Sequence, residues 1–176
     1  LAKKLRRDCY SMKITWKKKI LKGNKQDFII YKNSITEKIS KKANIKIEQK
    51  KDFPNLIYED ETAFFETNRT GRLYLREVFI FANNKPIIYA RTVFKNNLRQ
   101  LTSIIKKLNE NPLANIVFKK KTSRSGFIFS NLSVNHKLAK KLSNKKIPID
   151  KVDGIRRSTF ECKGEKILLT EIFFNN

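Results

Sequence analysis

The stretch from Leu73 to Phe94, LYLREVFIFANNKPIIYARTVF, carries the clearest local pattern in this chain. Two runs rich in Val, Ile, Tyr and Phe flank the polar segment 83–86, which is typical of a β-hairpin. Because side chains alternate across a strand, Arg76 and Glu77 lie on opposite faces of the first strand. A guanidinium cannot shed its charge, so burying Arg76, or Arg91 in the return strand, requires an anion or several hydrogen-bond acceptors opposite it.

The length and composition of the chain indicate a single folded domain, 1–176, large enough for a substantial core. Forty basic and 16 acidic residues give a net charge of +24, which favours anionic partners such as nucleic acid, an acidic membrane surface or a small polyanion. The lysines are, however, scattered along the chain and not gathered into one block. This distribution is typical of lysines that are simply solvated.

Composition also excludes several kinds of functional site. Cys9 and Cys162 have no metal-ligand spacing and His136 is the sole histidine, so a multi-histidine metal site is excluded and we expect no metal. We find neither a glycine-rich phosphate loop nor a set of serine, histidine and aspartate suited to hydrolysis. No apolar run approaches the roughly 20 residues of a membrane-spanning helix. Two cysteines and no recognisable signal peptide predict a reducing, cytoplasmic setting.

Short helices and further strands are predicted around the central hairpin. Ser34 to Glu37 fits a capping box, in which the serine caps the first helical turn and the glutamate reaches back to its amide. The patterns predict helices over 34–43, 98–108 and 136–146, a strand at 45–47, and a second hairpin of 156–162 with 166–174. The interspersed helices and hairpins indicate an α+β fold, mainly an antiparallel sheet with helices packed on it.

Two charged residues stand out because their neighbours on the same strand face are apolar. They are Arg76 in the first long strand and Glu171 in the last, and we expect both to converge on one pocket with the bend at 111–113. A buried arginine and a buried carboxylate can pair directly as a structural salt bridge. They can also face opposite ends of a polar ligand. The spacing alone leaves both arrangements open.

Five short motifs resemble, in the same order, those of the chorismate pyruvate-lyase family. They are YLREV at 74–78, ARTV at 90–93, KLNENPL at 107–113, GIRRS at 154–158 and LLTEIF at 168–173. The resemblance also takes in SIT at 34–36 and runs from about residue 28 to the C-terminus. It implies an antiparallel sheet with helices and a small internal ligand cavity covered by helical flaps.

The activity that this resemblance implies is the conversion of chorismate into 4-hydroxybenzoate and pyruvate, the first committed step of ubiquinone synthesis in many bacteria. The family works without metal or organic cofactor. We therefore expect a cofactor-independent carbon-oxygen lyase that acts on chorismate as a monomer. No nucleic acid and no membrane span are expected.

The resemblance also implies roles for individual residues. Arg76 would bind the ring carboxylate, helped by backbone amides near Ile35 and Leu113. Glu171 would face the opposite end of the ring and hydrogen-bond the 4-hydroxyl of the product. Arg91 would lie near the pocket and its flap, with a part in binding or release. The catalytic residues would be Glu171 and Arg76.

Two further expectations concern the acidic residues. Burial among apolar neighbours would raise the pKa of Glu171, so that it could give a proton to the departing ether oxygen. Glu77, on the other face of its strand, is expected to be a structural partner of Arg91, Arg156 or Arg157 and not a catalytic group.

Two alternatives to a lyase stay open. One is a non-catalytic protein that binds a small aromatic acid on the same fold. The other is a basic nucleic-acid-binding protein, which the charge favours but no recognition motif supports. Within the resemblance, Ala90 and Ile35 stand where the family commonly has glycine and methionine, and the segment 124–152 matches least well.

Overall fold

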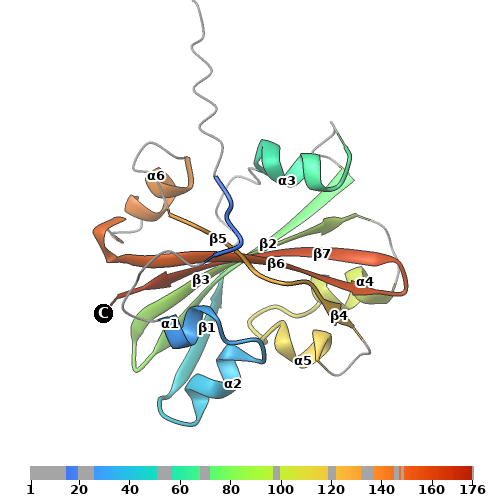
Figure 1. Cartoon of the computed structure of the whole chain (residues 1–176). Helices are drawn as coiled ribbons and strands as arrows, with labels where there is room; N and C mark the ends of the chain where they lie inside the picture. The colour runs from blue at the N-terminus through green and yellow to red at the C-terminus, as the bar shows by residue number, and fades with distance from the viewer. Residues whose placement is uncertain are drawn as a thin grey trace, which may run out of the picture.

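The computed structural model describes residues 15–19, 26–50, 57–67, 72–96, 100–118, 122–131, 137–144, 147 and 149–175. Cys9 and His136 lie outside the described residues, as do the ends of two predicted helices at 98–99 and 145–146. One antiparallel sheet has the strand order β1-β2-β3-β7-β6-β4, with β5 also paired to β6 (Figure 1). Its strands are β1 Ile45–Gln49, β2 Leu73–Ala82, β3 Lys85–Lys95, β4 Ser123–Arg124, β5 Ile128–Ser130, β6 Val152–Cys162 and β7 Glu165–Phe174. The α+β prediction is confirmed.

Both predicted hairpins are present, and their turns explain why these sequences fold back. Asn83 and Asn84 join β2 to β3 with φ values of 48° and 64°, and Lys163 and Gly164 join β6 to β7 with 50° and 75°. Two consecutive positive φ values characterise the type I′ turn, whose twist matches that of the strands. Asparagine and glycine tolerate this conformation best.

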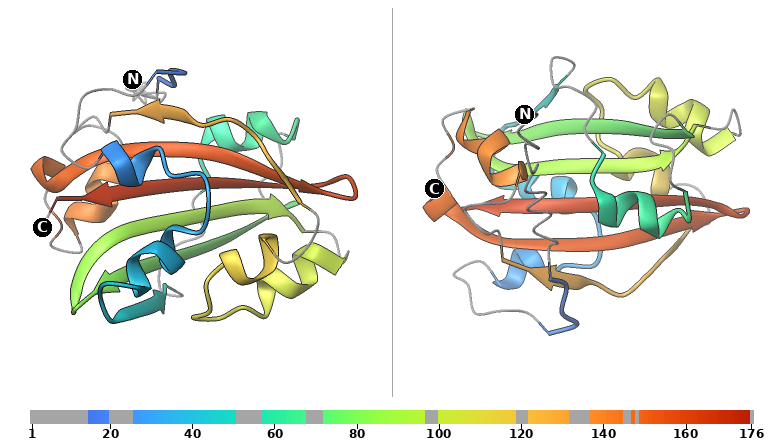
Figure 2. Two further views of the ribbon diagram at one scale, coloured as in Figure 1. Left: turned by 60° about the horizontal axis from the view of Figure 1, so that its bottom comes forward. Right: turned by 90° about the horizontal axis from the view of Figure 1, so that it is seen from above.

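Short helices cover both faces of the sheet. They are α1 Gln26–Ile29, α2 Ile35–Ser40, α3 Glu59–Phe64, α4 Gln100–Lys106, α5 Ala114–Val117 and α6 Lys137–Ser143, with a 3₁₀ turn at Ile149–Lys151. Helices α1, α2, α4 and α5 lie on one face, and α3 and α6 lie on the other (Figures 1 and 2). No helix in the described part of the chain combines the length and hydropathy needed to cross a bilayer.

The predicted helices are confirmed in place but are shorter than expected. Ser34 caps α2 as predicted, because its Oγ accepts a hydrogen bond of 3.2 Å from the Glu37 amide. Leu138 and Leu142 of α6 are buried against the sheet, so this basic helix is amphipathic. Helix α3 was not predicted, since its sequence EDETAF shows no clear apolar period.

The alternation of β2 divides the core into two layers. Val78 and Ile80 pack in the core under α1, α2, α4 and α5, whereas Phe79 packs in the core that includes the buried face of α6. A β-bulge at Ile87 of β3, opposite the step from Ile80 to Phe81 in β2, shifts the register between the two strands. Residues before the bulge therefore pair as Arg76 with Thr92 and Glu77 with Arg91. Directly paired residues point to the same side, so the bulge places Arg91 on the face of Glu77.

Arg91 and Glu77 belong to a buried charge network between the sheet and helices α3 and α6. The Arg91 guanidinium donates to both oxygens of Glu61, at 2.6 and 2.7 Å, and to Oε1 of Glu77 at 2.6 Å. Lys141 of α6 donates to the two oxygens of Glu77 at 2.6 and 2.5 Å, and the Tyr89 hydroxyl donates to the same carboxylate. The prediction that Glu77 is a structural partner of Arg91 is confirmed.

Glu61 is the residue that attaches α3 to this network. Its Oε2 also accepts a hydrogen bond of 2.8 Å from the Tyr58 amide, so one carboxylate caps the helix and pairs with the sheet. Burial by itself would lower the pKa of Arg91, but Glu61, Tyr89 and Glu77 raise it above its usual value. Arg91 is therefore charged, and removal of Glu61 would leave that charge buried with reduced compensation.

We expect Glu61→Gln to lower the free energy of unfolding by about 3 kcal/mol, because breaking a buried ion pair from one side leaves a desolvated charge. The measurement is urea-induced unfolding of both proteins. Glu161→Gln is the matched control, since Glu161 pairs with Lys166 at 4.0 Å on the exposed surface. That control should cost less than about 0.5 kcal/mol. Equal stability of the Glu61 variant and the parent would contradict this account.

Candidate active site

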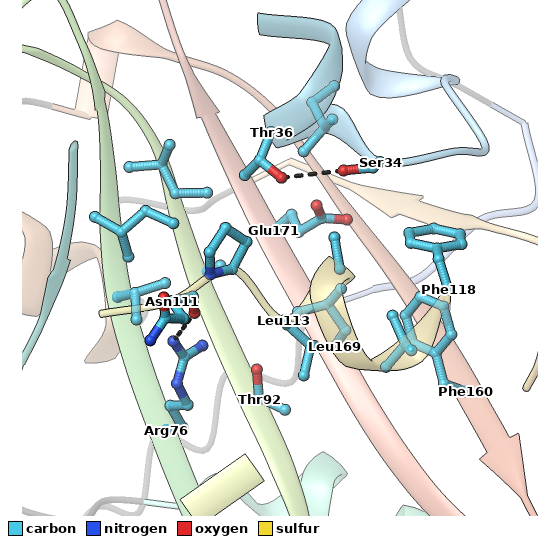
Figure 3. A pocket seen from close by; sticks show the side chains of 18 of the residues that line it. Ser34, Thr36, Arg76, Thr92, Asn111, Leu113, Phe118, Phe160, Leu169 and Glu171 are labelled. Carbon is cyan, nitrogen blue, oxygen red and sulfur yellow. Dashed lines mark hydrogen bonds between the residues drawn. The ribbon is translucent and has the colours of Figure 1, made fainter. Parts of the chain in front are cut away.

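A pocket lies between the sheet and the segments that carry α2 and α5 (Figure 3). The sheet contributes apolar lining residues that include Ile47, Val78, Ile80 and Leu169. The walls opposite the sheet are residues 33–36, at the start of α2, and residues 111–118, through α5. The pocket is therefore formed by strands that are far apart in sequence and by two short helical segments. These two segments lie where the predicted helical flaps would cover the cavity.

Arg76 reaches this pocket from β2 and is 3% exposed. Its Nη2 donates to the carbonyls of Asn109 at 2.8 Å and Asn111 at 2.7 Å, and its Nε has no hydrogen-bond partner among the described residues. Burial lowers the pKa of Arg76 to about 10, so it stays charged at neutral pH. No carboxylate among the described residues pairs with this guanidinium. It is therefore free to bind an anion.

Glu171 enters the same pocket from β7, two strands away from Arg76 and so about 10 Å across the sheet. Its carboxylate is held by Arg156, whose Nε and Nη2 donate at 2.5 and 2.9 Å. Arg124 donates to the same carboxylate from the sheet edge, at the longer distance of 3.3 Å. A direct salt bridge between Arg76 and Glu171, the structural alternative above, is thus not formed.

These two arginines also decide the charge of Glu171. Burial by itself would raise the pKa of the carboxyl group, but Arg156 and Arg124 outweigh that effect and hold the pKa below its usual value. The expectation of a raised pKa was wrong, because it considered only the apolar neighbours on the same strand. Glu171 is therefore a carboxylate in the free protein, suited to accept a hydrogen bond or a proton and not to donate one.

The same arginines fasten the chain that leads into α2. Arg156 Nη1 donates to the carbonyls of Phe28, Ile29 and Tyr31 at 3.2, 3.0 and 2.7 Å. Arg124 Nη1 donates to the Lys32 carbonyl at 2.8 Å. The pocket wall at 33–36 is thus held by the side chains that bind Glu171.

Gly154 allows α1 to approach β6 closely. A Cβ at this position would lie 2.8 Å from Cδ1 of Ile29, which is closer than side-chain carbons pack. The glycine at the start of the GIRRS motif thus has a packing role beneath the segment that Arg156 holds.

The pocket carries an excess of positive charge. Its charged lining residues are Arg76, Arg124, Arg156 and Glu171, and three positive charges less one negative charge leave +2. On the opposite face of the sheet, Arg91, Lys141 and Arg157 face Glu61, Glu77 and Asp60, which balance to zero. Buried charge that is uncompensated within the protein is costly, so the pocket is arranged for an anionic ligand.

The residues predicted from the sequence fall into two groups. Ile35 and Leu113 line the pocket with Arg76 and Glu171, and Figure 3 shows Asn111 beside Arg76. Arg91 does not line it: Ala90 and Thr92 face the pocket, and Arg91 points to the charge network on the other face. The bulge at Ile87 of β3 turns Arg91 to that face, so it is not a lining residue of the pocket. Its part in substrate binding or release stays a prediction.

Sequence reasoning missed Arg156 and Arg124 as parts of the site. A signal for Arg156 was present, because a two-residue turn at 163–164 pairs it directly with Glu171. Arg124 carried no such signal. It lies on a two-residue edge strand in the segment that matched the family least well, and its side chain crosses β6 to reach Glu171.

Comparison with known proteins gives the family of this chain. The family model described as chorismate lyase matches residues 12–176. A protein of Pseudoalteromonas translucida named "Probable chorismate pyruvate-lyase" is 24% identical over 157 residues, which cover 87% of this chain and 85% of the relative. A protein of the same name from Halorhodospira halophila is 24% identical over 150 residues, which cover 85% of this chain and 80% of the relative. Another, from Nitrosomonas europaea, is 29% identical over 120 residues, which cover 65% of each chain. The chain belongs to the chorismate lyase family.

Proposed function

We propose that this protein converts chorismate into 4-hydroxybenzoate and pyruvate. The observation that carries the proposal is the pocket charge of +2, in which Arg76 is buried without a carboxylate partner among the described residues. Chorismate carries two carboxylates and an apolar ring, so its charge and shape complement this lining. Membership of the chorismate lyase family, and relatives named "Probable chorismate pyruvate-lyase", support the same reaction.

In the proposed complex the ring carboxylate binds Arg76 and the ring lies against Val78, Ile80 and Leu169. A guanidinium in a dry pocket forms strong charge-assisted hydrogen bonds and fixes the plane of the carboxylate. The opposite end of the ring, with its hydroxyl group, then faces Glu171. This orientation assigns to Arg76 and Glu171 the two roles that the family resemblance implies, with Ile35 and Leu113 at the walls.

The reaction needs positioning more than a strong nucleophile, because the product gains an aromatic ring. The ether bond breaks with its electron pair leaving on the enolpyruvate oxygen. The ring carbon that bears the hydroxyl group loses its hydrogen as a proton, and the electrons of that bond complete the aromatic ring. The enolpyruvate takes up one proton on its methylene carbon, which becomes the methyl group of pyruvate, so the reaction releases no net proton. Glu171, as a carboxylate held by Arg156, accepts a hydrogen bond from the hydroxyl and is placed to receive the proton lost by the ring carbon.

The comparisons support neither alternative function. None of the matched relatives is named as a nucleic-acid-binding protein or as a non-catalytic binding protein. That the protein acts as a monomer in the cytoplasm, and that its product enters ubiquinone synthesis, stay predictions.

Turnover is the first test. We expect the purified protein in metal-free buffer to convert chorismate into 4-hydroxybenzoate, followed by ultraviolet absorbance, at a rate above that of chorismate alone. Release of equimolar pyruvate, measured with a coupled dehydrogenase, confirms the balance of the reaction. Absence of product from protein whose melting temperature is raised by 4-hydroxybenzoate would overturn the lyase and indicate a binding protein.

We expect Arg76→Met to weaken 4-hydroxybenzoate binding by about 30-fold or more, since losing a buried charged contact costs about 2 kcal/mol or more and each 1.4 kcal/mol is tenfold. The melting temperature of the free variant should equal or exceed that of the parent, because the lost guanidinium has no carboxylate partner among the described residues. Calorimetric titration and thermal melting measure the two effects. A variant that binds 4-hydroxybenzoate as tightly as the parent would argue against Arg76 as the anchor.

Glu171→Gln should lower kcat by about 100-fold or more, as expected for loss of a group that handles a proton. In the parent, kcat should not fall as the pH rises from about 5 to 8, since a carboxyl group with a lowered pKa is already ionised there. The activity that depends on this carboxylate is lost only as the pH drops below the usual range for glutamate. The role of Glu171 as proton acceptor would be refuted if kcat of the parent declined towards pH 8 and the Glu171→Gln variant kept the kcat of the parent.

A further inference from the structure

Arg124 is the charged residue of the pocket that the proposed roles leave unused. It belongs to β4 at the edge of the sheet, and its side chain runs over β6 into the pocket lining, which also includes the exposed Phe118. Its guanidinium lies against the rings of Phe127 and Phe160, 4.5 and 4.7 Å from their centroids. These rings hold the plane of the guanidinium in the pocket wall.

The hydrogen bonds of Arg124 differ from those of Arg156. Arg156 has a side chain only 1% exposed, and all three of its nitrogens are engaged, two with Glu171 and one with three backbone carbonyls. Arg124 is held by Ser158 at 3.0 Å through Nε and by the Lys32 carbonyl at 2.8 Å through Nη1. Its Nη2 reaches Glu171 only at 3.3 Å. Arg156 therefore satisfies Glu171 by itself, and Arg124 Nη2 has capacity for a stronger acceptor.

The charges of the pocket also indicate that Arg156 pairs with Glu171 and that Arg124 is available for a ligand. Arg156 neutralises Glu171, so the remaining excess of +2 is carried by Arg76 at one end of the pocket and Arg124 at the other. Burial lowers the pKa of Arg124 to about 10, which leaves it charged at neutral pH. A monocarboxylate can neutralise only one of these two guanidiniums. Chorismate has a second carboxylate, on the enolpyruvyl group attached next to the hydroxyl, which is the end of the ring that faces Glu171.

We propose that Arg124 binds the enolpyruvyl carboxylate of chorismate and so distinguishes the substrate from the product 4-hydroxybenzoate. This inference rests on the proposed lyase function. Arg124 Nη2 moves from its long contact with Glu171 to the substrate carboxylate, while Nε and Nη1 keep their bonds to Ser158 and the Lys32 carbonyl. The same guanidinium lies next to the oxygen on which negative charge develops as the ether bond breaks.

The test compares the two ligands in Arg124→Met, a variant that keeps length and removes charge. We expect KM for chorismate to rise about 30-fold or more, because a buried charged contact is lost, and the Kd for 4-hydroxybenzoate to stay within about threefold. KM is taken from turnover and Kd from calorimetric titration of the same preparation. Arg124→Lys keeps a charge and should recover at least about tenfold of the loss in KM.

Arg157→Met is the matched control, since Arg157 is buried on the opposite face of the sheet, paired with Asp60 at 2.6 Å and stacked on Trp16. It should leave KM and Kd within about twofold of the parent. A purely structural role for Arg124, in holding Lys32 or Glu171, would weaken both ligands equally, and that result overturns the inference. Unchanged KM overturns it as well. If the parent itself forms no product, the lyase proposal fails first, which turnover of the parent shows directly.

Discussion

The ion pair between Arg156 and Glu171 is the interaction on which the pocket depends. The two residues lie directly opposite each other on β6 and β7, so the turn at 163–164 fixes their contact. Through its remaining nitrogen Arg156 holds the carbonyls of residues 28, 29 and 31, and so the wall that leads into α2. It also keeps Glu171 ionised although that residue is buried. The Arg156 guanidinium thus positions the wall that leads into α2 and keeps Glu171, the proposed proton acceptor, charged. Because it pairs with Glu171, that carboxylate does not pair with Arg76.

Among the described residues, buried charges are paired on one face of the sheet and partly unpaired on the other. The paired charges stabilise the fold, and the unpaired charge serves the proposed ligand binding. On the face of α3 and α6 the charges of Arg91, Glu61 and Glu77 are paired with short hydrogen bonds, and they attach the helices to the sheet. On the pocket face Arg76 has only backbone carbonyls and no carboxylate among the described residues. A buried guanidinium in this state destabilises the free protein, and an anionic ligand removes that cost on binding. The net charge of +24 carries no such information, because solvated lysines dominate it.

Local patterns were sufficient to predict most of the fold, and they failed where contacts between distant segments decide the outcome. Alternation and turn residues predicted both hairpins and placed Arg76 and Glu171 on pocket-facing positions. The face of Arg91 depends on a bulge at Ile87, opposite residues 80 and 81, and this bulge has no local signature in a run of apolar residues. The pKa of Glu171 depends on Arg156 and Arg124, which are 15 and 47 residues away in sequence. The resemblance to the family pointed to Arg76, Glu171, Ile35 and Leu113, which all line the pocket. It did not point to Arg156 or Arg124, and it carried no information on the protonation state of Glu171.

The charge of the pocket also bears on how the proposed reaction ends. Chorismate brings two negative charges to a lining of +2, so the complex with substrate is balanced. After the ether bond breaks, 4-hydroxybenzoate and pyruvate carry one negative charge each. In the proposed complex, the enolpyruvyl group that becomes pyruvate lies at the Arg124 end of the pocket, whose lining includes the exposed Phe118. Departure of pyruvate leaves 4-hydroxybenzoate on Arg76, with one positive charge of the lining unbalanced. The carboxylate of 4-hydroxybenzoate still neutralises the buried Arg76, which has no carboxylate partner among the described residues. Because release of this product would leave that charge uncompensated again, the pocket that accepts the dianion also retains the aromatic product.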